Sequence, residues 1–145
     1  MNKKFMMFRG FEEDDSGDTK IYIDNNCFIG RWVYGYYWTN GLDNHFIRKV
    51  YDQETHYYVI EDHEVIPETV CQYVGVNDAS SNEIFENDLV TIPAYGGGKH
   101  LTSVYFRDGK FAVDGSNYGY KNLHGKTTKV VGNIFENPHM KECNA

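Results

Sequence analysis

The sequence predicts a mainly β protein, in which an aromatic-rich N-terminal sheet is followed by a small C-terminal SH3-like or barrel-like sheet with little helix. Aromatic residues make up 16% of the 145 residues, and fourteen glycines stand against three prolines. This composition is typical of strands joined by tight turns. Apolar and polar residues also alternate with a period of two, whereas no segment keeps a helical period over three turns.

The chain length fits one domain, which we expect to consist of two β lobes that share a core. The seam between the lobes is placed at Ile66-Pro67, where an acidic segment ends. The predicted lobes are therefore residues 1–66 and residues 67–145, and the motifs that resemble a known family gather in the second.

The clearest N-terminal strand covers residues 31–38, which read RWVYGYYW. One face of this strand would present Trp32, Tyr34, Tyr36 and Trp38. Asn40-Gly41 follows and favours a two-residue type I′ turn, so residues 45–51 are expected to return antiparallel. Since no Lys or Arg lies between Arg31 and Arg48, we interpret the four aromatics as core or subunit interface and not as a platform for nucleic-acid bases.

The strongest hairpin signal in the second half is Asp108-Gly109, which joins predicted strands at 102–106 and 110–113. A loop with three consecutive glycines, residues 94–100, is expected to connect two strands. The remaining predicted strands cover residues 21–23, 56–60, 70–74, 89–92 and 128–134. Short helical turns are expected at residues 83–89 and from Asn137 onward, where Pro138 suits a first helical position.

Charge is distributed unevenly along a chain of net charge −7, which argues against a protein that wraps duplex nucleic acid. Residues 51–68 contain no Lys or Arg, and they supply the candidates for contact with a basic partner: Asp52, Glu54, Glu61, Asp62 and Glu64. Residues 89–133 contain six basic and two acidic residues. Within them lie the candidates for contact with nucleic acid: Arg107, Lys110, Lys121, Lys126 and Lys129.

The sequence lacks the residue spacings that are typical of metal-binding and phosphate-binding motifs. We therefore expect no catalytic residues, no cofactor and no metal. His56, Glu61 and His63 do not form an HExxH motif, and the glycine loop lacks the Ser or Thr of a phosphate-binding Walker A motif. The three cysteines, Cys27, Cys71 and Cys143, are expected to be reduced thiols. No apolar stretch is long enough for a membrane span, and we expect a cytoplasmic protein of a bacterial host.

Three blocks of the sequence resemble the YopX family of phage and prophage proteins. They are WVYGY at residues 32–36, ETVCQYVGVNDASSNEIFENDLV at residues 68–90 and VVGNIFENP at residues 130–138. The resemblance covers essentially the whole chain. It implies an accessory protein with no established enzymatic activity whose members self-assemble, and it supplies no catalytic residue to carry over.

The expected function is therefore that of a phage or prophage accessory protein that acts by binding or by self-assembly as a homo-oligomer, without catalysis. One alternative is an anti-defence inhibitor, an acidic protein that blocks a host nuclease such as a CRISPR-associated one. Another alternative is a module that binds single-stranded nucleic acid through the basic segment.

Overall fold

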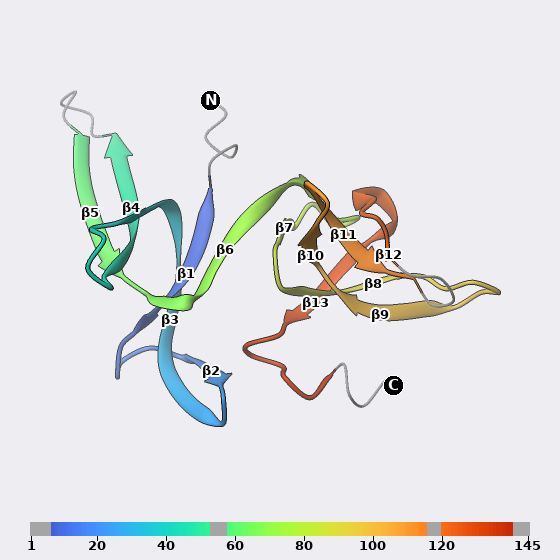
Figure 1. Cartoon of the computed structure of the whole chain (residues 1–145), viewed down its shortest axis with the longest axis horizontal. Helices are drawn as coiled ribbons and strands as arrows, with labels where there is room; N and C mark the ends of the chain where they lie inside the picture. The colour runs from blue at the N-terminus through green and yellow to red at the C-terminus, as the bar shows by residue number, and fades with distance from the viewer. Residues whose placement is uncertain (1–6, 53–57, 116–119, 141–145) are drawn as a thin grey trace. The chain divides into compact units, whose positions relative to one another are not determined.

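The structure is a computed structural model that describes residues 7–52, 58–115 and 120–140. Figure 1 shows that these residues form mostly β-strands joined by turns and loops, and one 3₁₀ turn lies at Gly125–Thr127. The prediction of a mainly β protein with little helix is thereby confirmed. No helix within the described ranges has the length and apolar character to cross a membrane.

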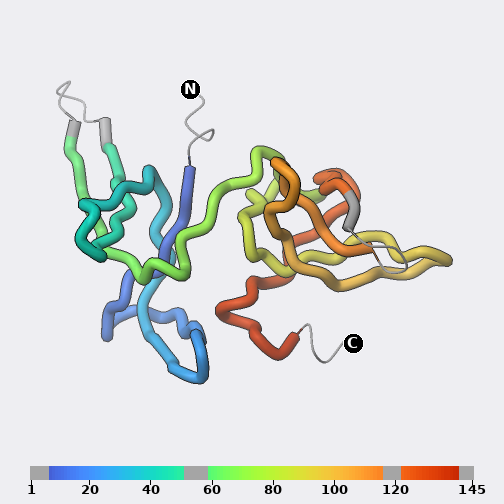
Figure 2. Tube along the Cα trace, viewed as in Figure 1, coloured from blue at the N-terminus to red at the C-terminus, as the bar shows by residue number. Residues whose placement is uncertain are grey.

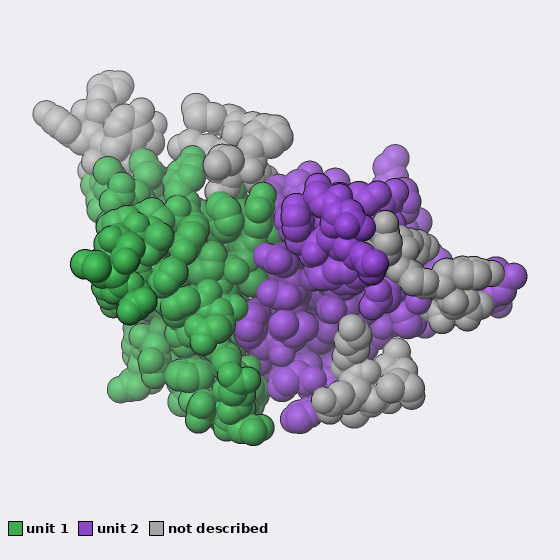
Figure 3. Space-filling view, viewed as in Figure 1, with its two compact units in different colours: residues 1–72 green, residues 73–145 purple. Residues whose placement is uncertain are grey.

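Two compact units make up the chain, Met1–Gln72 and Tyr73–Ala145 (Figure 3). Their boundary falls inside β6, which runs from Ile66 to Asn77. The seam expected at Ile66-Pro67 instead coincides with the beginning of this strand. β6 is continuous through the expected seam and through the boundary at Gln72–Tyr73. Its first half pairs with a strand of the first unit, and its second half pairs with a strand of the second unit.

The first unit is one antiparallel sheet with the strand order β5-β4-β3-β1-β6, and β2 pairs with the beginning of β3. The strands are β1 (Phe8–Glu13), β2 (Thr19–Ile23), β3 (Asn26–Thr39), β4 (His45–Asp52), β5 (Tyr58–Glu64) and the first half of β6. The long strand β3 contains the predicted strand at residues 31–38. It pairs with β1, β2 and β4, and it therefore organises the whole unit (Figure 1).

One face of this sheet encloses a small hydrophobic core. Val33, Ile47 and Val65 are at most 5% exposed and form its centre. Phe8, Tyr37 and Val70 pack around them. Gly10 is required here, because a Cβ atom at this position would lie 2.9 Å from the Val65 side chain.

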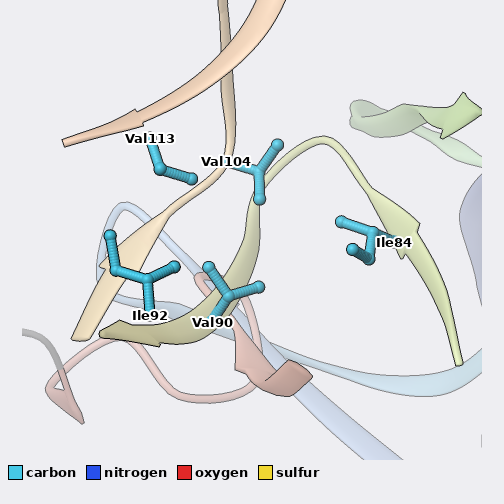
Figure 4. Close-up of a cluster of buried hydrophobic side chains, with 5 residues drawn as sticks. All are labelled: Ile84, Val90, Ile92, Val104 and Val113. Atoms are coloured by element: carbon cyan, nitrogen blue, oxygen red, sulfur yellow. The ribbon is translucent and has the colours of Figure 1, made fainter. Parts of the chain in front are cut away.

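The second unit contains two three-stranded antiparallel sheets, β13-β8-β9 and β10-β11-β12. Its strands are β7 (Glu83–Phe85), β8 (Asp88–Pro93), β9 (Lys99–Ser103), β10 (Tyr105–Arg107), β11 (Lys110–Asp114), β12 (Tyr120–Asn122) and β13 (Lys129–Asn133). The described strands do not close into a barrel. Ile84, Val90, Ile92, Val104 and Val113 form the core of this unit (Figure 4).

The hairpin predicted at Asp108-Gly109 is confirmed. Arg107 pairs with Lys110, and both turn residues have positive φ angles, 53° and 81°, as a type I′ turn requires. The glycine loop also lies where it was expected, at the end of the β8–β9 hairpin (Figure 2). All three of its glycines have positive φ angles.

The two-residue turn predicted at Asn40-Gly41 is wrong. Thr39 pairs with His45, so residues 40–44 form a five-residue loop. Side chains stabilise this longer connection, since Thr39 Oγ1 donates to the Asn44 carbonyl oxygen at 2.8 Å. The Leu42 amide donates to Asn40 Oδ1 at 2.9 Å and forms an Asx turn.

The helical turn predicted at residues 83–89 is also wrong, because β7 and β8 occupy this segment. Between the two strands Asn87 adopts a φ of 71°, and the Asp88 carboxylate accepts a hydrogen bond from the Phe85 amide at 2.8 Å. This tight turn takes the place of a helical one. Where a short helix was expected from Asn137, the structure has turn residues at 138–139 and a helical Met140, and residues 141–145 lie outside the described part of the chain.

Candidate functional site: the open face of the first sheet

The sheet face opposite the core of the first unit is rich in aromatic side chains. Val33 and Tyr37 of β3 point into the core, so Tyr34, Tyr36 and Trp38 lie on the other face. Tyr34 is 42% exposed and Tyr36 is 40% exposed. These two predicted interface or core residues are therefore surface residues of this chain.

The registers of β3, β4 and β5 extend this face into a continuous surface. Tyr36 is opposite Arg48, which in turn is opposite Asp62. By the same alternation Phe46 and Glu64 adjoin Trp38, and Val50 pairs with Ile60. We call this surface the open face; it comprises Tyr34, Tyr36, Trp38, Phe46, Arg48, Val50, Ile60, Asp62 and Glu64.

A hollow with a volume of about 350 Å³ lies at one end of the open face. Its lining consists of Met7, Tyr34, Gly35, Tyr36, Arg48, Lys49 and Val50. Gly35 is essential to this close packing, because a Cβ atom there would lie 2.2 Å from the Arg48 carbonyl oxygen. The absence of a side chain at Gly35 thus lets β4 approach β3 closely beside two exposed tyrosine rings.

A network of hydrogen bonds holds the other end of the open face. The Arg48 guanidinium donates to both oxygens of Asp62, at 2.8 Å and 3.0 Å, and the Trp38 indole donates to the same carboxylate at 3.1 Å. Arg48 also lies 5.1 Å from the centre of the Trp38 ring, which stacks on Phe46. The hydrogen bonds from Arg48 hold the pKa of Asp62 below its ordinary range, and Asp62 raises the pKa of Arg48.

The predicted acidic candidates are divided between the two faces of β5. Asp62 and Glu64 lie on the open face, where Glu64 accepts a hydrogen bond from Asn44 Nδ2 at 2.8 Å. Glu61 lies on the opposite face and contacts His63. Asp52 is the last residue of β4, and Glu54 falls outside the described residues.

Trp32 differs from the other aromatic candidates, because it packs against β1. The Phe11 ring meets it edge-on with a centroid distance of 5.3 Å, and the Arg9 guanidinium lies 4.8 Å from its ring centre. Phe11 is fully buried and Arg9 is 6% exposed. The predicted set of four thus separates into a packed Trp32 and three residues of the open face.

The predicted nucleic-acid contacts come together only in part. Arg107 and Lys110 are opposite each other at the tip of the β10–β11 hairpin, where Arg107 lies 3.6 Å from Asp108. Lys126 lies in the 3₁₀ turn and Lys129 in β13, a strand of the other sheet. Lys121 is a residue of β12 whose backbone pairs with Val113.

Sequence reasoning missed the residues that β4 contributes to the open face. Phe46, Arg48 and Val50 alternate in the sequence, which was a signal for a strand face. Their position beside Tyr36 and Trp38 depends on the five-residue loop, whereas the Asn-Gly dipeptide predicted a two-residue turn. The exposure of Phe106 at the β10–β11 tip was not predicted either, because the sequence indicated only that this residue belongs to a strand.

The structure also bears on the histidine and cysteine side chains that could bind a metal. No group of three or more His, Cys, Asp or Glu side chains is arranged there to hold a metal ion. Cys27 is exposed, whereas Cys71 is buried and its Sγ lies 3.2 Å from the Thr69 carbonyl oxygen. His56 and Cys143 are outside the described residues.

Polar residues of the sequence blocks that carry the family resemblance have structural roles in the second unit. Asp78 is 6% exposed, and it accepts hydrogen bonds from the amides of Ser80, Asn82 and Val130. Asn133 accepts hydrogen bonds from two amides of the turn that follows it. These contacts join the loop after β6 to β13 and explain why the blocks carry Asp and Asn at these positions.

Comparison with known proteins confirms the resemblance found in the sequence. No curated protein matches the chain. The model of the YopX family, described as YopX protein, matches residues 7–141, which is nearly the whole chain. The chain therefore belongs to the YopX family.

Proposed function

We propose that this protein is a phage or prophage accessory protein that acts in the bacterial cytoplasm by binding other protein surfaces through the open face, without catalysing a reaction. The observation that carries the proposal is the pair of exposed rings, Tyr34 and Tyr36, beside a hollow of about 350 Å³. The resemblance of its sequence blocks to the YopX family supports the proposed phage or prophage origin.

The chemistry of the open face suits protein recognition. Tyr, Trp and Arg are the residue types that contribute most binding energy at interfaces, and all three occur together here. Arg48 and Trp38 are held in place by Asp62, so little side-chain entropy is lost when a partner binds. A face prepared in this way favours binding of a folded protein.

Replacement of Tyr36 by alanine tests this proposal. We expect Tyr36→Ala to lose the complexes that the wild-type protein forms with itself or with a host protein, as seen by native mass spectrometry of protein purified from a bacterial host. The matched control is Ile29→Ala, which removes an equally exposed apolar side chain, 42% exposed, from the same strand. Both variants should fold, and if Tyr36→Ala keeps every complex, the proposal is wrong.

The anti-defence alternative has one observation in its favour. β5 is the edge strand of its sheet and carries three carboxylates within four residues, Glu61, Asp62 and Glu64. An acidic edge suits the basic groove of a nuclease. In cleavage assays with a panel of host nucleases, the protein should protect DNA, Glu61→Gln combined with Glu64→Gln should lose protection, and Glu68→Gln should retain it. Cleavage at the uninhibited rate with every nuclease would exclude this alternative.

A further inference from the structure

We infer that the second unit binds single-stranded nucleic acid across the outer face of its β13-β8-β9 sheet, where Tyr95 stacks on a base and Lys99 and Lys129 contact phosphates. This inference goes beyond the proposed function, because it concerns another unit of the chain and another class of ligand. It is carried by the charge of this face and by an exposed tyrosine at the end of the β8–β9 hairpin.

The outer face of this sheet follows from the strand registers. Val90 and Ile92 of β8 belong to the core of the second unit, and side chains alternate between the two faces along a strand. The other residues of β8 at the hairpin end, and the residues opposite them on β13 and β9, therefore point away from the core. We call this surface the basic face; it comprises Thr91 and Pro93 of β8, Lys99 and Leu101 of β9, and Lys129 of β13.

Lysine supplies both charged side chains of the basic face. Lys99 and Lys129 are exposed, and no residue of this face is acidic. The three strands contain a single carboxylate, that of Asp88, which is 2% exposed and accepts a hydrogen bond from the Phe85 amide. In a chain with 21 acidic and 14 basic residues, such a face is a local concentration of positive charge. This charge favours a polyanionic ligand.

The spacing of the two lysines suits contacts along one strand of nucleic acid. They belong to the two strands that flank β8, and they are opposite residues two positions apart, Thr91 and Pro93. With about 4.8 Å between strands and about 3.4 Å per residue, their Cα atoms are roughly 12 Å apart. The two ammonium groups can therefore contact separate phosphates, with the uncharged Thr91 between them.

An aromatic ring is exposed at the end of the β8–β9 hairpin (Figure 2). Tyr95 is 71% exposed, and three glycines separate it from Lys99. A Cβ atom added to any of these glycines would meet nothing within 4 Å, so a base has room to approach the backbone beside the ring. Aromatic rings next to cations are the usual means of binding single strands without sequence preference.

The tip of the β10–β11 hairpin is less suited to this ligand, although it carries two cations. Arg107 lies 3.6 Å from the Asp108 carboxylate. On the same face of the sheet, Asp114 accepts a hydrogen bond from the Tyr105 hydroxyl at 2.7 Å. Two carboxylates therefore offset the charges of Arg107 and Lys110, whereas the strands of the basic face carry no exposed carboxylate.

Two double variants of equal net charge test the contacts with phosphate. Lys99→Gln combined with Lys129→Gln removes the charges of the basic face, and Arg107→Gln combined with Lys110→Gln removes those of the tip. Binding of a fluorescein-labelled oligothymidylate is measured by anisotropy over a series of salt concentrations. Each phosphate contact on a single strand adds about −0.7 to the slope of log K against log salt. We expect the first pair to make this slope less negative by about 1.4, and the second pair to leave it unchanged.

Replacement of Tyr95 by alanine tests the stacking contact. Tyr95→Ala should weaken binding by about fivefold or more, the lower end for loss of one stacked base, and should leave the salt slope unchanged. The control is Tyr22→Ala, which removes a 41% exposed tyrosine from the first unit and should bind like the wild type. All these positions are exposed, so the variants should fold, which circular dichroism verifies.

Three results would overturn the inference. The first is the absence of salt-dependent binding by the wild-type protein. The second is a salt slope that changes with the tip pair and not with the lysine pair, which would place the contact at the tip. The third is unchanged binding by Tyr95→Ala together with equal competition by inorganic polyphosphate, which would make the basic face a general anion surface. None of these results bears on the open face, whose test is the loss of protein complexes in Tyr36→Ala.

Discussion

His63 Nδ1 lies 2.7 Å from Glu12 Oε2, although the two residues are 51 positions apart. They belong to β5 and β1, which are separated by β4 and β3 in the sheet. His63 is opposite the core residue Ile47 in the sheet and therefore lies on the core face. Glu12 lies on the same face, because it is two residues after Gly10, which is opposite the core residue Val33. The sheet therefore curls around its core until its first and fourth strands meet through these two side chains.

Loss of the His63–Glu12 contact is expected to destabilise the first unit. The His63 side chain is 17% exposed and the Glu12 side chain 21% exposed, so both are largely removed from water. His63→Ala should lower the free energy of unfolding in urea by about 1.5–3 kcal/mol, the range for a hydrogen bond to a charged group. His124→Ala, at an exposed position, should change it by less than about 0.5 kcal/mol. Equal stability of the two variants would contradict this role of His63.

Gly35 is expected to tolerate no side chain, because an added Cβ atom would collide with a backbone atom of β4, which cannot move aside as a flexible side chain can. The added Cβ of Gly35→Ala would meet the Arg48 carbonyl oxygen at 2.2 Å, so β3 and β4 must separate. We expect a loss of about 3 kcal/mol in the free energy of unfolding, at the upper end for overpacking. The control is Gly98→Ala, which meets no neighbouring atom but has a φ of 77°, and it should lose only about 1 kcal/mol. The reverse order of the two losses would show that the close approach at Gly35 is not needed.

Elements that depend on residues adjacent in the sequence were predictable. The alternation of residues 31–38 predicted both the strand and the faces on which Tyr34 and Tyr36 lie. Asp108-Gly109 predicted a type I′ turn because only two residues determine its φ angles. Three blocks of local sequence likewise sufficed to identify the family.

The hollow and the curl of the sheet were not predictable, because they depend on the register between distant strands. Arg48 reaches Tyr36 only because five loop residues, not two, connect β3 to β4. The difference is due to side-chain hydrogen bonds of Thr39 and Asn40 within the loop. The turn preference of a dipeptide carries no information about such contacts. When the predicted loop length is wrong by an odd number of residues, every residue of β4 is assigned to the wrong face of the sheet.

Asp78 is expected to make the second unit sensitive to acid. Burial by itself raises the pKa of this carboxyl, but hydrogen bonds from the amides of Val130, Asn82 and Ser80 outweigh it and hold the pKa below its ordinary range. The unfolded chain then binds a proton more readily than the folded one, so stability falls as the pH drops below about 4. Asp78→Asn should flatten this part of the stability profile, measured by urea unfolding at a series of pH values.

The amount of stability that depends on Asp78 can be measured near neutral pH. Asp78→Ala leaves three part-buried amides without their acceptor and should cost about 3 kcal/mol in the free energy of unfolding. Asp15→Ala is the control, because Asp15 is exposed and does not have a positive φ angle. An acid profile of Asp78→Asn that matches the wild type would show that other carboxyls determine the acid sensitivity.

Asn87 is expected to be replaceable by glycine but not by a β-branched residue. Its φ of 71° is a left-handed conformation, which glycine adopts freely and valine adopts with strain. The conformation matters because the Asn87 amide donates to the Val104 carbonyl at 2.8 Å and the Asn87 carbonyl accepts from the Ile134 amide at 3.0 Å. Asn87→Val should therefore lower the free energy of unfolding by about 2 kcal/mol, whereas Asn87→Gly should stay within about 0.5 kcal/mol of the wild type.

The same two substitutions at Asn122 provide the control for Asn87. Asn122 is exposed on β12, where a strand backbone favours valine over glycine. Valine should thus be the better replacement at Asn122 and the worse one at Asn87. If valine is the better replacement at both positions, the left-handed turn between β7 and β8 does not limit the stability of the second unit.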